Sequence, residues 1–461
     1  MAKKIRTVYV CQECGYDSPK WMGQCICGAW NSMVEEKVNL IDEDDNRRRG
    51  STITGKVPKA NKLNEIKSDG NFSRLDTGIS EFNRVLGGGI VKGSLTLISG
   101  EPGIGKSTII MQAASNLSNR GLRVLYVSGE ESEEQLKLRA DRICGTLSDN
   151  LFVLAETNIE NINIVAEEMK PDFIIIDSIQ TTYSSKLDSA PGSVSQVRHC
   201  GNEFMRIGKM AGVPIFIVAH VTKSGDLAGP KIVEHLVDCV LHFTGERNQE
   251  LRILRSVKNR FGTTSEIGAF EMEEEGLKEI TNLSKTFLDG LGEGREGSVV
   301  GAVYEGTRPL LLEIQGLTST TNVGFARRTP IGVEMSRLNM IIAVLERKVH
   351  MPLLNQDVFV NVVGGLKPEG TSTDLAVALA IHSSYTGKAS NGKTIAIGEI
   401  GLTGDLRSVQ NSERIVKEAV RMGFTKIILP YGNAKKLPHM GDNIKVIAAR
   451  NLNEAIDAYC V

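Results

Sequence analysis

The sequence predicts an α/β protein whose main part is a doubly wound, parallel sheet. First, short apolar runs alternate with helix-like stretches between residues 71 and 275. Second, these runs have the character of short strands joined by helical crossovers. Third, a glycine-rich loop stands between the first run and a helix-like stretch. The predicted strands are residues 95–98, 124–127, 173–176, 215–218 and 240–243.

Composition divides the chain into three modules and two linkers. Its 461 residues suggest two to four domains, at roughly 150 residues for each. Residues 1–35 hold four cysteines and both tryptophans and are too few for a core of their own, so this unit needs a staple. Residues 36–70 and 276–296 are polar and are expected to be linkers. The other two modules are residues 71–275 and 297–461.

The last module also reads as α/β, with mixed strand and helix patterns. Predicted strands cover residues 310–314, 358–363, 394–397 and 426–429, and predicted helices cover 336–348, 373–385 and 412–422.

Bulk properties set limits on the class of protein. The formal net charge of −1 argues neither for nor against nucleic acid, because a basic patch can lie on a neutral chain. The basic start of the chain is followed at once by cysteine and polar residues, so no signal peptide is expected. No apolar run approaches the roughly 18–20 residues that span a bilayer. We therefore expect a cytoplasmic protein with no membrane segment.

The glycine-rich loop fits G-x-x-x-x-G-K-[ST] at every fixed position. Its strand–loop–helix context predicts a loop whose backbone N–H groups surround phosphates. Lys106 would reach the β- and γ-phosphates, and the Ser107 hydroxyl would hold Mg²⁺. The sequence therefore predicts a site for a nucleoside triphosphate, taken to be ATP. The residues of this site are Gly100, Glu101, Pro102, Gly103, Ile104, Gly105, Lys106, Ser107 and Thr108.

Carboxylates follow two other predicted strands. Asp177 ends the buried run 173–176, where a carboxylate can orient the Mg²⁺ shell, although it could also begin a turn. Glu130 and Glu131 follow the run 124–127, and either could position the attacking water. An acidic pair at the start of a helix is the structural alternative for these two glutamates.

Four of the eight cysteines cluster near the start of the chain. The pairs are Cys11 with Cys14 and Cys25 with Cys27. Four thiolates form the closed tetrahedral set that Zn²⁺ prefers, and zinc would be the staple that the small unit needs. The first pair has the usual two-residue spacing, whereas the second has one residue between its thiols. The alternative is a set of reactive or unpaired thiols.

Several motifs together resemble one family. Residues 74–78 (RLDTG), residues 86–90 (LGGGI) and the phosphate loop resemble the ATPase core of RecA, KaiC and DnaB. The pentapeptide KNRFG at 258–262, with the cysteine cluster and the last module, resembles the bacterial RadA (Sms) DNA repair family over nearly the whole chain. The resemblance implies a RecA-like ATPase core, an N-terminal zinc finger and a C-terminal Lon-protease-like domain. That family has C-x-x-C at the second cysteine pair, so this chain is one residue short there.

The resemblance also implies an activity. It implies a DNA-stimulated ATPase that assembles as a ring, expected to be a hexamer, on single-stranded or branched DNA. Such a motor promotes branch migration of recombination intermediates and acts beside a RecA-type recombinase. In the family pattern Glu130 matches the catalytic glutamate. Lys258 and Arg260 resemble residues that reach the nucleotide of the neighbouring subunit, where cations stabilise charge on the transferring phosphoryl group.

Two segments match the channel-facing loops of RecA-like rings. They are residues 183–197 and 222–230, both rich in Gly, Ser and Lys. Their expected phosphate partners are basic, with ordinary surface charge as the alternative. His220 and Thr222 match the position of a γ-phosphate sensor. The candidate DNA-binding residues are Lys186, Arg198, Lys223 and Lys231.

The last module resembles the proteolytic domain of Lon, which uses a Ser–Lys pair. In our alignment Asp374 takes the position of the nucleophile and Glu413 falls near that of the lysine, with Ser372 two residues from Asp374. We therefore expect an inactive, scaffolding domain that also faces DNA. Its candidate phosphate contacts are Arg327, Arg328, Arg337, Arg347 and Lys348.

Two other functions compete with a DNA motor. A KaiC-like regulatory ATPase or protein kinase shares the LGGG and double-glutamate features. A Lon-type ATP-dependent protease shares the last module but requires the missing Ser–Lys pair. The KNRFG pentapeptide and the cysteine cluster favour the motor.

Overall fold

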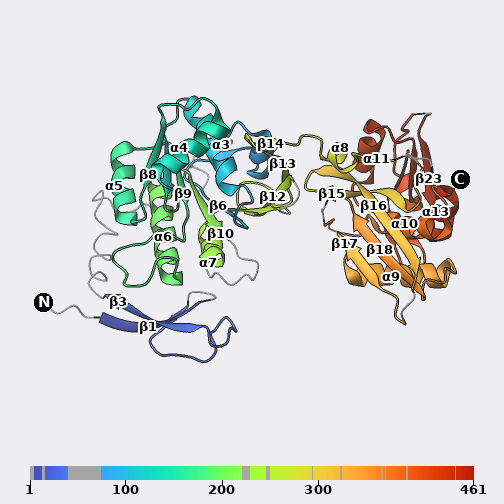
Figure 1. Cartoon of the computed structure of the whole chain (residues 1–461), viewed down its shortest axis with the longest axis horizontal. Helices are drawn as coiled ribbons and strands as arrows, with labels where there is room; N and C mark the ends of the chain where they lie inside the picture. Colours follow the sequence, from blue (N-terminus) through green and yellow to red (C-terminus); the bar gives the residue numbers. More distant parts are fainter. Residues whose placement is uncertain are drawn as a thin grey trace, which may run out of the picture. The chain divides into compact units, whose positions relative to one another are not determined.

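The computed structural model separates the chain into two compact units, which span Met1–Ile280 and Thr281–Val461 (Figure 1). Within the described residues, none of the helices combines the length and the apolar character needed to cross a bilayer. The described residues are 5–12, 16–39, 74–220, 229–245, 250–292, 294–321, 324–364, 367–368, 370–390, 393–441 and 443–460.

A three-stranded antiparallel sheet begins the first unit. Strand β1 (Ile5–Cys11) lies between β2 (Asp17–Ser18) and β3 (Met33–Asn39). Its small core consists of Cys11, Cys25 and Met33, all buried. A core of this size cannot stabilise a fold alone, so the unit depends on its cysteine cluster.

The main sheet of the first unit has nine strands in the order β14-β13-β12-β11-β6-β10-β9-β7-β8. The run from β11 to β8 is parallel, and its strands match the predicted apolar runs except β8, which was not predicted. Strands β6, β7 and β9 are buried along their whole length because helices cover both faces. The parallel strands are β6 (Leu95–Gly100), β7 (Val124–Ser128), β8 (Leu151–Ala155), β9 (Phe173–Asp177), β10 (Ile215–His220) and β11 (Cys239–Thr244).

Three antiparallel strands extend this sheet beyond the predicted parallel part. They are β12 (Leu251–Asn259), β13 (Ile267–Glu273) and β14 (Gly276–Glu279). A short hairpin pair, β4 (Arg74–Leu75) and β5 (Ile90–Val91), lies outside the sheet. Residues 276–296 are therefore not a bare linker as expected. Their first part pairs with β13, and α8 (Leu283–Phe287) begins the second unit.

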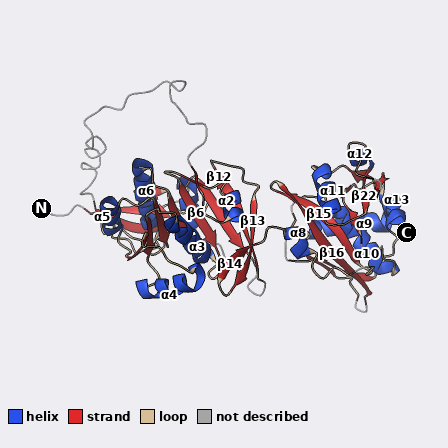
Figure 2. Ribbon diagram, turned by 90° about the horizontal axis from the view of Figure 1, so that it is seen from above, coloured by secondary structure: helices blue, strands red, loops and turns tan. Residues whose placement is uncertain are grey.

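Helices cover both faces of the nine-stranded sheet. The helices α2 (Ser80–Val85), α3 (Lys106–Asn119) and α4 (Glu133–Cys144) pack on one face, and α5 (Ile159–Met169), α6 (Val194–Ala211) and α7 (Gly229–Leu236) pack on the other. Figure 2 shows α3 and α4 on the side opposite to α6. Side-chain caps fix where the crossovers turn into helices, as at Ser132, Asn158 and Ser193.

The second unit is built on a seven-stranded sheet with the order β17-β18-β16-β15-β19-β22-β23. Its strands are β15 (Ser298–Glu305), β16 (Arg308–Thr320), β17 (Arg328–Ile331), β18 (Gln356–Val362), β19 (Thr394–Ala396), β22 (Lys426–Pro430) and β23 (Lys445–Ala449). The pair β20 (Glu399–Ile400) and β21 (Leu406–Arg407) forms a separate hairpin. The helices are α9 (Met335–Lys348), α10 (Asp374–Thr386), α11 (Ser412–Arg421), α12 (Tyr431–Ala434) and α13 (Leu452–Tyr459).

Helix α10 packs unusually closely on this sheet. A Cβ at Gly301 would lie 2.9 Å from the Cβ of Ala376, and one at Gly316 would lie 2.8 Å from the backbone of Ala380. Glycine at these two strand positions therefore lets the helix backbone approach. The first ten residues of α10 are all buried, which places Asp374, at its start, in the interior.

Candidate nucleotide site

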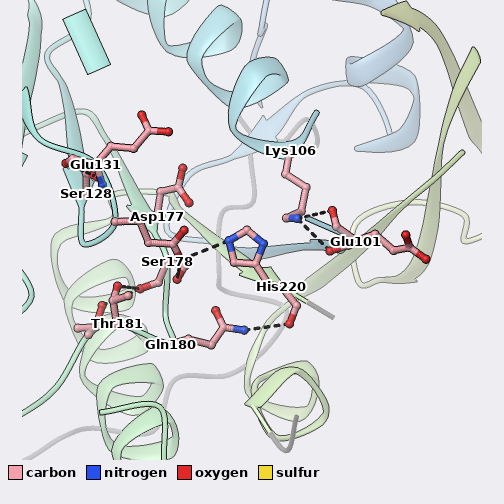
Figure 3. A network of polar contacts seen from close by, with 12 residues as sticks. Glu101, Lys106, Ser128, Glu131, Asp177, Ser178, Gln180, Thr181 and His220 are labelled. Carbon is pink, nitrogen blue, oxygen red and sulfur yellow. Dashed lines mark hydrogen bonds and ion pairs between the residues drawn. The ribbon is translucent and has the colours of Figure 1, made fainter. Parts of the chain in front are cut away.

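Four parallel strands bring the candidate residues to one edge of the nine-stranded sheet. Gly100 at the end of β6 pairs with His220 at the end of β10, and Ser128 at the end of β7 pairs with Asp177 at the end of β9. Because the carboxyl ends of parallel strands meet at the same edge, the side chains that follow them gather there. Figure 3 shows Lys106, Asp177, Ser178 and His220 around this edge.

The phosphate loop connects β6 to α3. Gly105 precedes the helix with φ of 115°, and a Cβ there would lie 2.8 Å from the side chain of Met272. Gly103 also has positive φ, with open space where its Cβ would be. The loop therefore keeps an exposed backbone turn in front of a helix N-terminus, which is the arrangement that binds phosphate.

Lys106 is buried at the start of α3. Its ammonium donates hydrogen bonds of 2.9 Å to the carbonyl oxygens of Gly100 and Glu101 (Figure 3). Burial lowers the pKa of Lys106 to about 8, against the opposing effect of Asp177 and Glu130. Neutral carbonyls satisfy the donors without compensating the charge, so phosphate oxygens would be better partners. The neighbouring Ser107 is half-buried.

Asp177 is held by a buried tyrosine. The Tyr126 hydroxyl donates a 2.6 Å hydrogen bond to Asp177 Oδ2, and Arg139 donates to the Tyr126 oxygen at 3.2 Å. Burial, and then the negative charge of Asp177, raise the pKa of Tyr126 well above its ordinary value, so it stays a donor. This series of hydrogen bonds, from Arg139 to Tyr126 to Asp177, fixes the Asp177 carboxylate at the end of β9. An oxygen ligand held there, with the Ser107 hydroxyl, suits Mg²⁺.

The structure separates the roles of the two adjacent glutamates. Glu131 forms an ion pair of 2.6 Å with Arg139, so its charge is already compensated. Glu130 Oε1 instead lies 2.5 Å from the Ser178 hydroxyl, which donates to it, and 3.3 Å from Nε2 of His220. Contact with His220 is the largest cause that lowers the pKa of Glu130, to about 2. Of the two glutamates, Glu130 is the one directed toward the other site residues.

The basic pentapeptide lies away from this site. Lys258 and Arg260 are at the end of β12, where Asn259 pairs with Cys239 and Cys239 pairs with Thr96 near the start of β6. Lys258 donates to the carbonyl of Glu234 at 2.7 Å, and Arg260 donates to Asp238 at 3.0 Å. The structure therefore places Lys258 and Arg260 at the edge of the sheet opposite to the phosphate loop.

The structure describes the side chains of two of the four candidate DNA-binding residues, Lys186 before α6 and Arg198 within it. Lys186 and Arg198 are exposed. Lys223, like the sensor candidate Thr222, lies outside the described residues. Lys231 belongs to α7, but its side chain also lies outside the described part.

Three of the four clustered cysteines lie together. The ligand atoms of Cys11, Cys25 and Cys27 are within 4.8 Å of one another, and the sulfurs of Cys11 and Cys27 are 3.8 Å apart. A tetrahedral zinc site with Zn–S bonds of about 2.3 Å requires sulfurs about 3.8 Å apart. The one-residue spacing of Cys25 and Cys27 therefore allows convergence on one ion. Cys14 lies outside the described residues.

The protease-like region of the second unit holds a buried ion pair. Asp374 accepts from Nε of Arg337 at 2.9 Å and from Nη2 of the same residue, and the Ile400 N–H donates to it at 3.2 Å. Burial raises the pKa of Asp374 in spite of the arginine. Ser372 donates to the Ala302 carbonyl at 2.8 Å, and Glu413 pairs with Lys417 on the surface. Arg337, expected as a phosphate contact, is therefore engaged within its own domain.

Sequence reasoning did not find the residues that orient the site. Tyr126, Arg139, Ser178 and Gln180 each contact a predicted residue or its neighbour. Ser178 directly follows Asp177, and this adjacency was the one available signal. The others are brought in by strand register and helix packing, which no local pattern shows.

This fold and site define a P-loop ATPase with an N-terminal metal-binding ribbon and a C-terminal Lon-like domain. Family models match all three parts in chain order: a rubredoxin metal binding domain at residues 9–35, an AAA domain at 62–226 and the subunit ChlI of Mg-chelatase at 313–433. A KaiC-like protein of Pyrococcus horikoshii covers 46% of this chain and 100% of its own, with 18% identity and a TM-score of 0.39.

The particular family follows from curated relatives. DNA repair protein RadA of Bacillus subtilis is 49% identical over 98% of both chains. DNA repair protein RadA of Halalkalibacterium halodurans is 48% identical over 99% of both. The chain belongs to the RadA family of DNA repair proteins, an ATP-hydrolysing family, which confirms the resemblance and the predicted fold class.

Proposed function

We propose that this protein is a DNA-dependent ATPase that moves as a ring on single-stranded or branched DNA. It acts in recombinational repair beside a RecA-type recombinase and promotes branch migration. The observation that carries the proposal is the position of KNRFG. It lies at the sheet edge opposite to the phosphate loop, so its cations suit the nucleotide of another copy.

The strand register gives the size of this separation. Asn259 aligns through Cys239 with Thr96, and the loop begins four residues further along β6, at Gly100. At about 3.3 Å for each residue, this is roughly 13 Å along the strand. In this chain Lys258 donates to the backbone carbonyl of Glu234, and Arg260 forms an ion pair with Asp238. A catalytic role for Lys258 and Arg260 therefore requires head-to-tail packing of subunits, which forms a ring when the rotation between neighbours closes.

The nucleotide site has the residues for ATP and Mg²⁺. Lys106 and the loop backbone would hold the phosphates, and Ser107 and Asp177 would hold Mg²⁺. When bound, the ion would neutralise charge that develops on the phosphates. Glu130 would accept a proton from the attacking water and position it.

DNA contacts are proposed on the loop segments 183–197 and 222–230. Lys186, Arg198, Lys223 and Lys231 are the candidates, and they would follow the phosphate backbone without reading sequence. The small N-terminal sheet would be stabilised by Zn²⁺ on Cys11, Cys14, Cys25 and Cys27.

The Lon-like domain is proposed to be a scaffold and not a protease. Asp374 is committed to Arg337, and Ser372 is committed to a backbone carbonyl. A Ser–Lys mechanism needs a lysine that removes the proton of the nucleophile. The aligned position holds Glu413, whose surface pairing with Lys417 serves no nucleophile.

The test is the steady-state rate of ATP hydrolysis with and without single-stranded DNA, with a matched RNA of the same length as a control. We expect strong stimulation by DNA, and we expect Lys258→Ala to reduce the stimulated rate without weakening ATP binding. Mixing Lys258→Ala subunits with Lys106→Ala subunits should restore part of the rate, because one copy supplies the loop and another the pentapeptide. A rate indifferent to DNA would instead favour a regulatory, KaiC-like ATPase.

A further inference from the structure

The pentapeptide KNRFG is fixed in place by contacts from elements far away in the sequence. The Arg74 guanidinium donates a 2.7 Å hydrogen bond to the carbonyl of Phe261. A Cβ at Gly262 would lie 3.0 Å from the Cα of Gly87, so glycine at these positions lets the turn after β12 lie against the chain that follows α2. The Asn259 side chain closes the turn by accepting from the Phe261 N–H at 2.9 Å. The backbone of the pentapeptide is therefore held on more than one side.

A single buried carboxylate contacts the side chain of Arg260. Asp238 stands directly before β11, and only 4% of its side chain is exposed. Its Oδ1 accepts from Nη1 of Arg260 at 3.0 Å, and its backbone carbonyl accepts from the Arg260 N–H at 3.1 Å. Its Oδ2 accepts from Lys209 at 2.8 Å and from the Leu95 N–H at 3.1 Å. One oxygen of Asp238 therefore holds the start of β6 and the end of α6, and the other holds Arg260.

The hydrogen bond from the β6 N–H does not explain why Asp238 carries a charge. A neutral polar side chain could accept that bond, whereas a buried carboxylate is costly unless cations compensate it. Lys209 and Arg260 share the one carboxylate, so the cluster keeps an excess of one positive charge. Arg260 is 58% exposed, and among the described residues Asp238 is the one carboxylate with which its guanidinium pairs. The other N–H groups of this planar fork can therefore bind an anion from outside this chain.

We propose that Asp238 is a positioning residue that orients the Arg260 guanidinium toward the γ-phosphate of a nucleotide on the neighbouring subunit. The inference rests on the proposed DNA-dependent ATPase, in which Arg260 acts on another copy, and it names the residue that orients this cation. An exposed arginine samples many rotamers and loses this freedom when it binds. A bond to one nitrogen removes much of that freedom beforehand and leaves the rest of the fork for the transferring phosphoryl group. Asp238 itself touches no nucleotide and acts through Arg260.

The experiment compares Asp238→Asn with Lys209→Met in the full-length protein. The asparagine can still accept the bond from the β6 N–H, and the two cations that lose their partner are half exposed and solvated, so the fold should survive. We expect the DNA-stimulated kcat to fall about tenfold, because a hydrogen bond to a charged group is worth about this factor. The KM for ATP and the affinity for single-stranded DNA should stay near the wild-type values. Lys209→Met is the matched control, since it removes the other cation from the same carboxylate and should leave kcat unchanged.

Mixed subunits separate a positioning role from a structural one. Lys106→Ala subunits keep Asp238 and Arg260 but lack an active phosphate loop, whereas Asp238→Asn subunits keep the loop. Their mixture should hydrolyse ATP faster than the sum of the two separate rates, because a Lys106→Ala copy can offer its oriented Arg260 to an intact loop. Damage to the fold of the Asp238→Asn subunit would not be repaired in this way. The double variant of Asp238→Asn with Arg260→Ala should be no slower than Arg260→Ala alone.

The outcomes distinguish this inference from the function on which it rests. If Arg260→Ala keeps the wild-type stimulated rate, the action of Arg260 on another copy and the inference both fail. If Arg260→Ala is slow and Asp238→Asn is not, the inference alone fails. It also fails if the mixture recovers nothing, or if Lys209→Met loses as much kcat as Asp238→Asn.

A faster Asp238→Asn enzyme would overturn the inference as well, because Asp238 would then compete with the nucleotide for Arg260. If Asp238→Asn does not fold, Asp238→Glu takes its place. That variant keeps the charge and moves the carboxylate by one methylene, and the same loss of kcat, recovered in the mixture, is expected.

Discussion

Lys106 in the first unit and Asp374 in the second are both buried charges at the start of a helix, and their surroundings differ. Lys106 begins α3, and its ammonium is bonded to two backbone carbonyls. Asp374 begins α10, and its carboxylate is bonded to Arg337 and to a backbone N–H. The first charge is hydrogen-bonded and feels Asp177 and Glu130, but it forms no ion pair with a described residue. The second is neutralised within its own domain.

This difference distinguishes a binding site from a structural ion pair. A buried charge without an opposite charge costs free energy, and a ligand that supplies the opposite charge recovers that cost. A buried ion pair offers nothing to a ligand and is costly mainly when one partner is removed. The sequence alignment alone identifies both positions as possible sites. Only the side-chain contacts show that Lys106 can still take a charged ligand, whereas Asp374 already has a charged partner in its own domain.

The largest effect is expected from Lys106→Ala. The substitution removes the cation that would meet the β- and γ-phosphates, and we expect ATP turnover to fall by at least about 100-fold. Lys106 donates to backbone carbonyls and not to a carboxylate, so the substitution leaves no buried carboxylate without a hydrogen-bond donor. The melting temperature should therefore stay the same or rise slightly. Turnover and calorimetry on the same preparation check both statements. Near-normal turnover would refute the site assignment.

Asp374→Ala should have the opposite result, with stability lost and ATP turnover kept. The change leaves the Arg337 guanidinium without its partner, and the second unit should lose about 3 kcal/mol of unfolding free energy. ATP turnover by the folded protein should persist. Chemical denaturation followed by probes in each unit measures the loss.

A double variant sharpens this second test. Replacing the pair by apolar residues, Arg337→Met with Asp374→Leu, should recover most of the stability because no charge remains buried. If Asp374→Ala destroys turnover while the protein stays folded, the pair has a functional role and the comparison fails.

Several strands of both units could be predicted because they are apolar or alternating runs. The predicted run at 173–176 became β9, and the predicted helix 336–348 became α9 with one more residue. The antiparallel strands β12 and β13 were not predicted. They mix exposed and buried positions at the sheet margin, and β12 carries charged residues such as Arg252 and Lys258.

The nucleotide site was predictable to the extent that its residues form a contiguous motif or end a strand. Lys106 and Asp177 are of this kind. The residue pattern by itself left the choice between Glu130 and Glu131 open, because adjacent residues share every local feature, and only the family resemblance favoured Glu130. In the structure the choice depends on Arg139, which lies in α4, eight residues after Glu131, and forms an ion pair with it. A partner at this spacing is not a neighbour on the same helix face, so no periodic pattern in the sequence identifies it.

The smallest expected effect is the pH dependence of ATP affinity, which tests most directly whether the Lys106 charge lacks an ion-pair partner. Burial lowers the pKa of Lys106 to about 8, whereas phosphates bind the protonated form. Between pH 8 and 9.5, ATP affinity measured with a chelator in place of Mg²⁺ should therefore weaken by about tenfold for each pH unit. Lys106→Ala should show no such dependence. The unfolding free energy should move the other way, because the folded protein binds fewer protons than the unfolded chain in this range. A wild-type affinity that is flat from pH 7 to 9.5 would mean that the Lys106 charge is already compensated, as that of Asp374 is.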